Sequence, residues 1–476
     1  MSGGDLSALL SRIDFAWITS VHIIYPPLTI GLAILLLFSE WRWLKTNNDR
    51  WYRLCRFFER LFIVNFGAGV ATGVTMEMAF GILYGRFSQA AGPFFGQVLG
   101  YETITAFMYE SGFLGLMIFG WGKISKRMHL FATFNVALSS TFSAFWILDA
   151  NSWLQTPSGV VMKNGVIQMQ NWAAAILNPD VFTAFPHMEV AALELSVCFV
   201  AAVCAWFVLN KRHVELFLKP LKLALLALVL IAPLQIFIGD ELGRVTADAQ
   251  PAGLAAMEGH YHKFLPNGQT NSAWNVVAWP NADNSGNAFS IKIPHMLSLL
   301  ETHSWNAPVP GLDDFKPADR PPVVMPFYAF RAMAGVGGAL FLLALWGVWL
   351  ALRGKLTLAK ASGNKWFLRA VVFSVALPYI GVWTGWWTRE ISRQPWLVYG
   401  LMRTSEGVSH MSVAAAVIWL VGFVAFEVMV MATTWYFLAK IVRTGPDLKS
   451  PVADYGQQTG GAGPHAQARA HSHAHA

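Results

Sequence analysis

The sequence predicts an all-α integral membrane protein with nine transmembrane helices. Only 13% of its 476 residues are charged and 55% are hydrophobic, whereas a soluble domain carries about 25% charged residues. A helix needs roughly 20 consecutive apolar residues to cross the hydrocarbon core of a bilayer. Runs of that length lie near residues 14–38, 57–84, 93–121, 130–152, 184–209, 221–238, 326–350, 370–388 and 411–438.

The net charge of +7 does not indicate nucleic-acid binding. A polytopic membrane protein collects Lys and Arg in its cytoplasmic loops, so we expect no nucleic-acid partner. The cysteines Cys55, Cys198 and Cys204 lie in or beside apolar segments and form no CxxC or CxxCH motif. This pattern disfavours both a disulfide framework and a covalently attached haem.

The distribution of Lys and Arg predicts the orientation in the membrane. The loops after the first, third, fifth and seventh segments are rich in both residues, while the loops after the second, fourth and eighth carry fewer in total. Because basic loops remain in the cytoplasm, the N-terminus is expected outside and the C-terminus in the cytoplasm.

These segments divide the chain into three parts. Residues 1–445 form the transmembrane domain. A polar, Pro-rich external loop, residues 239–325, is inserted between the sixth and seventh helices and is too long for a simple connector. Residues 446–476 are rich in Gly, Ala and His and are expected to form a disordered tail.

Ionisable side chains within the apolar segments are functional candidates, because a charge inside a bilayer is costly. Segments that begin outside place their first residues near the outer face, and the eighth segment ends there. One layer near that face is therefore expected to contain five possible haem-iron ligands: His22, Glu102, His187, Met333 and Glu390. His with Met forms a low-spin b-type site, whereas a single protein ligand leaves iron open to dioxygen. Spacing does not show which ligands pair, and a lone buried His is more often a core residue.

Two other haem arrangements do not fit the sequence. Haem–copper oxidases need several histidines, including an adjacent pair, and the chain has no His-His. The bis-His cytochromes of quinone complexes use histidines fourteen residues apart, but the residue fourteen positions after His187 is Ala201.

Several stretches resemble subunit I of the cytochrome bd-type quinol oxidases, and the resemblance covers about residues 10–445. The most specific is SRQPW at 392–396, similar to the G-R-Q-P-W motif after the eighth helix of that family. The others are VHIIYPPLT around His22, GVATGVTMEMAFG, YETITAFMYES with Glu102 and Glu110, WILDANSWLQTP, FPHM around His187, and FYAFRAM around Met333.

The resemblance implies that His187 and Met333 are the axial ligands of a low-spin haem b. It implies that His22 and Glu390 bind two high-spin haems, one a haem b and the other a haem d or a third haem b. Glu102 is expected close by.

The same resemblance implies that Arg331 and Arg393 lie near haem propionates or quinol. Trp386, with its neighbour Trp387, is a candidate to fill the space between haem rings, although packing alone explains most buried tryptophans.

The external loop resembles the quinol-binding loop of the family, and Glu258 in LAAMEG matches its carboxylate. A lysine usual five residues earlier is Gly253 here, and we expect Gly253→Lys to be tolerated. The stretch from Glu258 to Arg331 is short, which is similar to the short-loop branch that includes the cyanide-insensitive oxidases.

Quinol oxidation releases two protons and two electrons, so its site needs a base at the outer surface. Glu258 is the candidate, the alternative being a solvated loop residue. Dioxygen reduction consumes protons, and Glu102 and Glu110 suit a path from the cytoplasm, since they are separated by about 12 Å of rise and about 80° around one helix. A structural hydrogen bond is the alternative for Glu110. Such a protein generates proton-motive force without pumping.

The resemblance further implies a location in the bacterial cytoplasmic (inner) membrane, in contact with lipid. The implied partners are subunit II of the oxidase and a small single-helix subunit, with quinol and O2 as substrates. Glu77 and Glu427 have no obvious partner in this chain.

Two other functions remain open from the residues alone. A proton-coupled transporter accounts for the buried carboxylates and histidines, but inverted repeats typical of such proteins are not apparent. A haem electron conduit that does not react with O2 accounts for the ligands as well.

Overall fold

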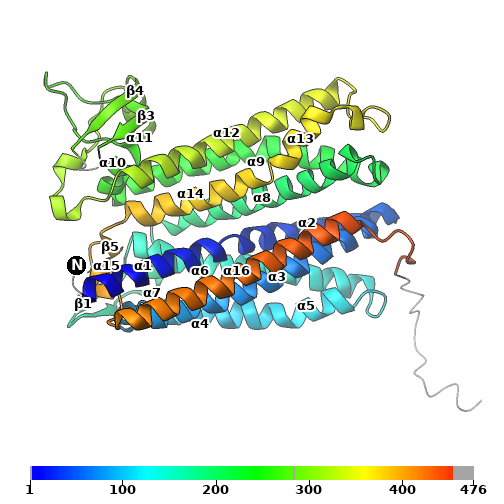
Figure 1. Ribbon diagram of the computed structural model, residues 1–476, viewed down its shortest axis with the longest axis horizontal. Coiled ribbons are helices and arrows are strands. Elements are labelled where there is room, and N and C mark those ends of the chain that lie inside the picture. Colours follow the sequence, from blue (N-terminus) through cyan, green and yellow to red (C-terminus); the bar gives the residue numbers. More distant parts are fainter. Residues whose placement is uncertain (1–2, 282–284, 454–476) are drawn as a thin grey trace, which may run out of the picture.

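The computed structural model describes residues 3–281 and 285–453. Long helices run side by side along the longest axis of the molecule (Figure 1). Eight helical segments are long and apolar enough to cross a membrane, which confirms the prediction of an all-α membrane protein. They are Gly4–Thr46, Asp49–Ile82, Lys126–Gln155, Val181–Leu209, Val214–Ala249, Val324–Leu352, Lys365–Ser392 and Val413–Thr444.

The third expected segment, 93–121, falls on three consecutive helical elements. These are α4 (Gly85–Glu102), the π-helix η1 (Thr103–Met108) and α5 (Tyr109–Phe119). None of the three is by itself counted among the spanning helices of the described chain, so nine spans stay a prediction. A π-turn is rare and costs helical regularity, and it occurs most often at functional sites.

Prolines divide two of the expected helices. The first segment is two helices, α1 (Gly3–His22) and α2 (Tyr25–Thr46), and Pro26 and Pro27 lie in the first turn of α2. Proline has no N–H and disfavours helical geometry in the residue before it. The eighth segment is likewise divided into α13 (Lys365–Phe373) and α14 (Ala376–Ser392), with Pro378 in the first turn of α14.

The helices pack in two groups that share one apolar core. In the first, α9 (Val214–Ala249) packs against α8 (Val181–Leu209) and α12 (Val324–Leu352), and α14 packs against α12 and α8. In the second, α3 (Asp49–Ile82) packs against α1, α2 and α16 (Val413–Thr444), and α6 (Lys126–Gln155) packs against α2, α4 and α5. Contacts between α2 and α8 join the groups.

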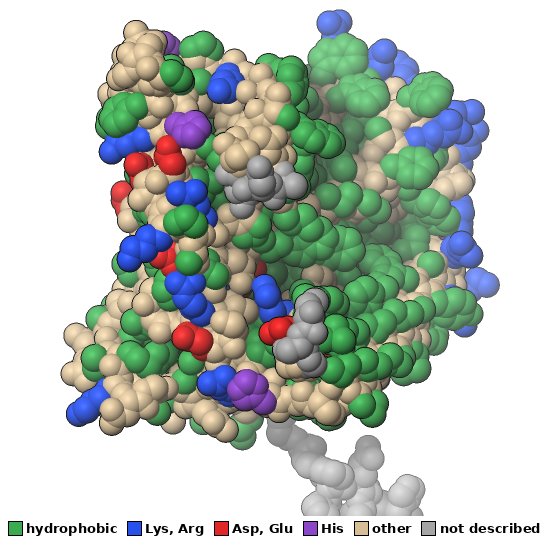
Figure 2. Space-filling model, turned by 60° about the vertical axis from the view of Figure 1, so that its left-hand side comes forward, with side chains coloured by type: hydrophobic (Ala, Val, Ile, Leu, Met, Phe, Trp, Pro, Cys, Tyr) green, Lys and Arg blue, Asp and Glu red, His purple; other side chains and the backbone are tan. Residues whose placement is uncertain are grey.

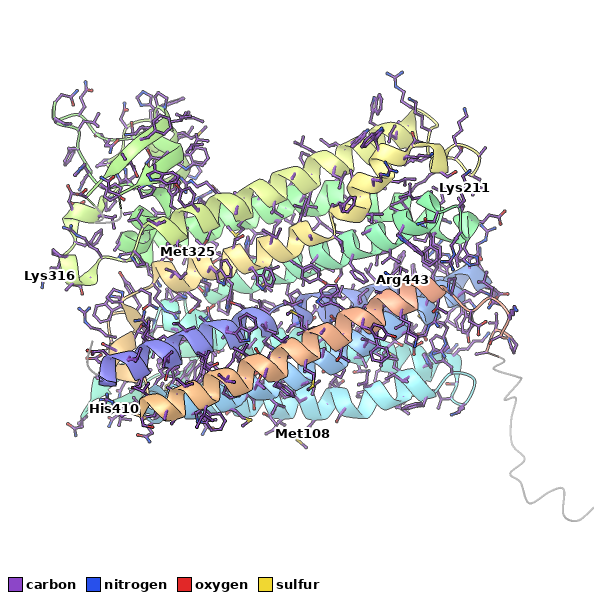
Figure 3. The ribbon with its side chains drawn as sticks, viewed as in Figure 1. Met108, Lys211, Lys316, Met325, His410 and Arg443 are labelled. Carbon is purple, nitrogen blue, oxygen red and sulfur yellow. The ribbon has the colours of Figure 1, made fainter. Side chains whose placement is uncertain are left out.

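Charge is concentrated at the two ends of the bundle. Figure 2 shows a broad hydrophobic surface between an end with mixed charges and a far rim of Lys and Arg. Lys211 and Arg443 lie at one end, and Lys316 and His410 lie at the other (Figure 3). An apolar band between polar ends is the surface that a bilayer requires. Which end faces the cytoplasm stays a prediction.

The inserted loop is a small folded unit, and it begins later than expected. Helix α9 continues to Ala249 rather than ending at 238. Within this extension Arg244 pairs with Asp240 at 2.6 Å and Glu241 at 3.2 Å, spacings that stabilise a helix. The unit then contains α10 (Pro251–Glu258), the antiparallel strands β3 (Trp274–Pro280) and β4 (Asn287–Ile293), and α11 (Met296–Thr302). Two short 3-10 turns, Leu312–Asp314 and Pro317–Asp319, lead into α12.

Short elements complete the same end of the molecule. They are the hairpin β1 (Val160–Lys163) and β2 (Val166–Met169), helix α7 (Trp172–Ile176), the hairpin β5 (Trp396–Val398) and β6 (Met402–Arg403), and helix α15 (Thr404–Gly407). A single 3-10 turn, Ala361–Gly363, precedes α13.

The described part of the expected tail is not free of the bundle. Arg53 on α3 donates hydrogen bonds to the carbonyl oxygens of Asp447 (2.9 Å) and Ser450 (3.2 Å). The expectation of disorder stays a prediction for 446–453, and for 454–476 it lies outside the described residues.

Candidate functional site

The centre of the inserted unit is an ion pair between Glu258, the last residue of α10, and Arg331 on α12. Arg331 Nη2 lies 2.6 Å from Glu258 Oε2. The same guanidinium donates to the carbonyl oxygens of Met257 (2.5 Å) and Asn275 (2.6 Å), and it lies 3.9 Å from the ring centre of Phe327. Arg331 therefore fastens α10 and β3 to the start of a membrane helix.

Several buried polar atoms around this pair have no hydrogen-bond partner within the described residues. They are Arg331 Nε, Asn275 Oδ1 and Trp274 Nε1. A buried polar atom without a partner costs about 1–3 kcal/mol, so a cluster of such atoms marks a place where a polar ligand or water completes the bonding. Glu258 itself is only 3% exposed, so the alternative of a solvated loop carboxylate is wrong.

Gly253 lies on α10, buried beside the end of α14. A Cβ added there would lie 3.1 Å from the carbonyl oxygen of Ser392. A lysine at 253 thus requires this backbone to move by a few tenths of an ångström, a steric obstacle that the sequence did not show. That Gly253→Lys is tolerated stays a prediction.

His187 and Met333 lie in the same group of four helices, where glycines allow close approach. A Cβ at Gly385 on α14 would lie 2.7 Å from Met333 Sδ, and a Cβ at Gly239 on α9 would lie 3.1 Å from His187 Cε1. The side-chain amide of Gln235 lies 3.2 Å from His187 Nε2. An imidazole and a thioether are the donor set of a low-spin haem, and both are present in this group of helices, so these residues fit that cofactor.

His22, at the end of α1, lies against α3. Its Nδ1 is 3.0 Å from Thr72 Oγ1, and that hydroxyl donates to the carbonyl oxygen of Ala68 at 3.0 Å. Thr72 can therefore accept a hydrogen bond from the N–H at Nδ1, which leaves Nε2 with its lone pair, the form that binds iron. A Cβ at Gly73 would lie 3.3 Å from the imidazole, so the helix passes close to the ring.

Glu390 lies at the end of α14 in a network with α6. Arg393 forms an ion pair with one of its oxygens. The other accepts hydrogen bonds from Asn151 (2.8 Å) and Gln155 (3.3 Å), both from the stretch WILDANSWLQTP. Within the described chain, the ion-pair partner of the buried Arg393 guanidinium is thus Glu390.

A second ion pair, which the sequence did not indicate, stands beside this network. Arg389 pairs with Asp180 and donates to Asn151 Oδ1 at 2.6 Å. Asn151 therefore links the two pairs, and the order of α6, α8 and α14 around Glu390 is fixed by charge as well as by packing.

The tryptophans of α14 divide between two environments. Trp386 packs against a cluster formed by Ile30, Ala144, Leu148 and Ala192, so its predicted place beside a haem stays a prediction and its observed role is packing. Trp383 and Trp387 are stacked, with centroids 6.5 Å apart, and both indoles donate to Ser20.

Glu102 and Glu110 both face α6. Glu102 accepts a hydrogen bond from Ser143 (2.7 Å), and Glu110 accepts one from Ser140 (2.8 Å). Both carboxyl groups are 5% exposed. The π-turn lies between them, so the regular α-helical geometry assumed from the sequence does not apply, and the carboxylates converge on two serines that are about 4.5 Å apart along α6.

Other buried carboxylates have partners that the sequence did not reveal. Glu427 accepts from Thr75 at 2.9 Å, so the expectation that it lacks a partner is wrong. Glu40, just beyond the first expected span, lies 2.7 Å from His129 Nδ1 and accepts from Thr133 at 2.6 Å. The spacing of His129 and Thr133, one helical turn, is the only signal of this cluster in the sequence.

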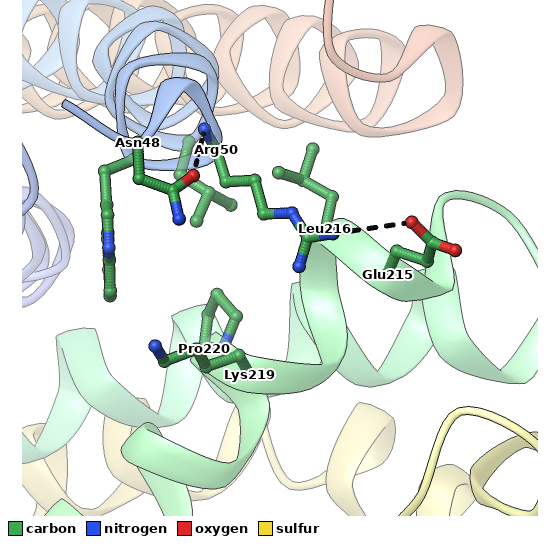
Figure 4. A pocket seen from close by; sticks show the side chains of 8 residues that line it. Asn48, Arg50, Glu215, Leu216, Lys219 and Pro220 are labelled. Carbon is green, nitrogen blue, oxygen red and sulfur yellow. Dashed lines mark hydrogen bonds and ion pairs between the residues drawn. The ribbon is translucent and has the colours of Figure 1, made fainter. Parts of the chain in front are cut away.

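A small pocket at the end of the bundle remote from Glu258 has no link to these sites. Figure 4 shows its lining at the starts of α3 and α9, with Arg50 and Glu215 paired at 3.5 Å. Both side chains are exposed, and we assign the pocket no role.

Comparisons with known proteins show the family to which the chain belongs. A family model for cytochrome bd terminal oxidase subunit I matches residues 10–446. Cytochrome bd ubiquinol oxidase subunit 1 of Bacillus subtilis (strain 168) is 34% identical over 433 residues, which cover 89% of this chain and 90% of the relative. Cytochrome bd-II ubiquinol oxidase subunit 1 of Escherichia coli (strain K12) is 31% identical over 92% of this chain and 96% of its own.

The fold has a solved counterpart in the bd oxidase from Geobacillus thermodenitrificans. The two superpose with a TM-score of 0.84 at 27% identity, covering 94% of this chain and 100% of the other. The chain therefore belongs to the cytochrome bd terminal oxidase subunit I family.

Proposed function

We propose that this protein is the quinol-oxidising and dioxygen-reducing subunit of a bd-type terminal oxidase in the bacterial cytoplasmic membrane. Family membership supports the overall reaction. The observation that carries the assignment of a quinol site is the buried Glu258–Arg331 pair, surrounded by unpartnered polar atoms.

Glu258 acts as the base for a quinol hydroxyl. Its carboxylate, held by Arg331, accepts a proton as the quinol loses an electron. The inserted unit lies at one end of the bundle (Figure 1), which we take as the outer end, so the proton leaves to that side. Arg331 and Asn275 position the headgroup through the groups that lack partners.

His187 and Met333 are the proposed ligands of a low-spin haem b. His22 and Glu390 are the proposed ligands of two high-spin haems, one haem b and one haem d or b. Haem bound at these residues supplies one-electron transfer and, at an open iron position, dioxygen reduction. Thr72 sets the tautomer of His22, and Arg393, Asn151 and Gln155 hold the carboxylate of Glu390 in place.

Glu110 and Glu102 carry protons from the cytoplasmic side toward this layer. Their carboxyl groups and the hydroxyls of Ser140 and Ser143 line one side of α6. Protons consumed from inside and released outside produce a proton-motive force without a pump.

A second membrane subunit covers part of the apolar surface of this chain. Glu77 lies on α3 within a spanning segment and is exposed, which is costly against lipid. Exposed Val70, Val74 and Met78 lie on the same helix. We propose subunit II of the oxidase as the occupant, together with a small single-helix subunit elsewhere.

An optical spectrum distinguishes this function from its alternatives. The purified, dithionite-reduced protein is expected to show haem absorption that changes on addition of carbon monoxide. A spectrum without haem bands would favour a transporter, and haem that does not bind carbon monoxide would favour an electron conduit.

Glu258→Gln tests the quinol site. The amide still bonds to Arg331 but cannot take up a proton, so quinol-driven turnover should fall by about 100-fold or more. Gln is preferable to Ala, because removing one partner of a buried pair costs about 3–5 kcal/mol of stability. Turnover is measured with quinol and with an artificial donor that reduces the haems directly.

The artificial donor is the control for folding and haem content. We expect its rate to survive in Glu258→Gln. Equal loss with both donors would place the defect in the fold, and a normal rate with quinol would remove Glu258 from the site.

A further inference from the structure

A second carboxylate, Glu301 on α11, lies beside the proposed quinol site. Leu297 on α11 and Leu254 on α10 belong to one buried cluster, with Ala247 of α9 and Trp274 of β3 packed against it. Glu301 is one helical turn after Leu297, and Glu258 is one turn after Leu254. Each carboxylate is therefore on the face of its helix that contributes to this shared contact.

Glu301 is partly buried, and its Oε2 atom is buried with no hydrogen-bond partner within the described chain. An orphaned carboxylate oxygen of this kind is poised to bond a ligand or water. The nearby Trp274 Nε1 and Arg331 Nε are unpartnered as well, so the unsatisfied polar atoms extend from Glu258 toward α11.

Charged groups from two other helices act on Glu301. Glu258 comes from α10, and Asp240, Arg244 and Asp248, spaced four residues apart, come from one face of the extended end of α9. Burial first, and then the charge of Glu258, raise the pKa of Glu301 to about 8, against a smaller opposing effect of Arg244. The carboxyl is thus largely protonated at pH 7 and ionises as the pH rises through about 8.

We propose that Glu301 is the second proton acceptor of the quinol site, acting beside Glu258. This inference rests on the quinol oxidase function proposed above. Two O–H bonds of the quinol break, one proton passes to Glu258 and one to the ionised form of Glu301, and both then leave to external water. The two electrons go to the electron-accepting centre of the oxidase, which that activity supplies, and the product is the quinone.

A base that ionises near neutral pH exchanges protons readily in both directions. Because only the ionised form of Glu301 accepts a proton, quinol turnover of the wild type should rise with pH through about 8. If Glu301 had only a structural role, no rise of turnover with pH would depend on this residue.

The experiment compares pH profiles of quinol turnover in the intact oxidase for the wild type, Glu301→Gln and Glu301→Asp. We expect Glu301→Gln to lose the rise near pH 8 and to lower kcat there by about tenfold, while Glu301→Asp retains the rise. Asp314→Asn is the matched control, because it removes an exposed carboxylate of the same inserted unit that does not act on Glu301 and should leave the profile unchanged.

The artificial donor separates chemistry from folding. Its rate should be the same in all variants. A Glu301→Gln enzyme with the wild-type profile and kcat would overturn the inference, as would equal loss with both donors. If Glu258→Gln remains defective in that case, the proposed function stands and only the role of Glu301 fails.

Discussion

Met333→Leu is expected to abolish the low-spin haem signal and with it quinol oxidase activity, while the oxygen-binding haems are largely retained. Leucine has a similar apolar volume, so the exchange costs less than about 1.5 kcal/mol of stability, but it has no sulfur to bind iron. The readout is the reduced spectrum of the purified variant together with its turnover.

Met325 offers a matched control on the same helix. It is exposed at the start of α12, and Figure 3 shows it near the end that carries the inserted unit. Met325→Leu should leave the spectrum and turnover unchanged. If folded Met333→Leu gives the wild-type reduced spectrum, Met333 is not an iron ligand.

Glu110→Gln is expected to leave haem content and electron entry intact while slowing dioxygen reduction and its charge movement by about 100-fold. Gln keeps the shape and the bond to Ser140, but it cannot hold and release a proton at neutral pH. The measurement is membrane potential generated by proteoliposomes during a single turnover at matched haem content.

Two further variants distinguish a proton relay at Glu110 from a structural role. Ser140→Ala removes the hydrogen bond but keeps the carboxyl group, so a relay should lose much less charge movement than in Glu110→Gln. Replacement of Glu102, which lies toward the proposed haem layer, should also disturb the high-spin spectrum. Full-rate charge movement in Glu110→Gln would leave only a structural role for this residue.

The sequence predicted the membrane helices well, because burial in lipid imposes a long apolar run on each. It failed at their ends. Helix α9 continues past 238 through charged residues that pair with one another, and no hydropathy pattern reports such pairs. Proline breaks inside the first and eighth segments were visible as residues, but their effect depends on packing.

The sequence allowed candidate residues of the site to be named more easily than their hydrogen-bond partners. Motifs around His22, His187 and Met333 indicated the candidate ligands. The stretch WILDANSWLQTP was also recognised, but the sequence did not show that its Asn151 donates a hydrogen bond to Glu390. Partners come from helices distant in sequence, as for Glu427 and Thr75. Glu301 had no motif at all, since only the packing of α11 on α9 and α10 brings it near Glu258.

Arg331 has a consequence for electron tunnelling. It binds Met257, Glu258 and Asn275 at the base of the inserted unit, and it is two residues before Met333 on the same helix. With quinol at Glu258 and a haem at Met333, as proposed above, the donor and acceptor of the first electron transfer are both held beside one turn of α12. Their separation then depends on Arg331 and Met333, and not on the number of residues between β3 and α12.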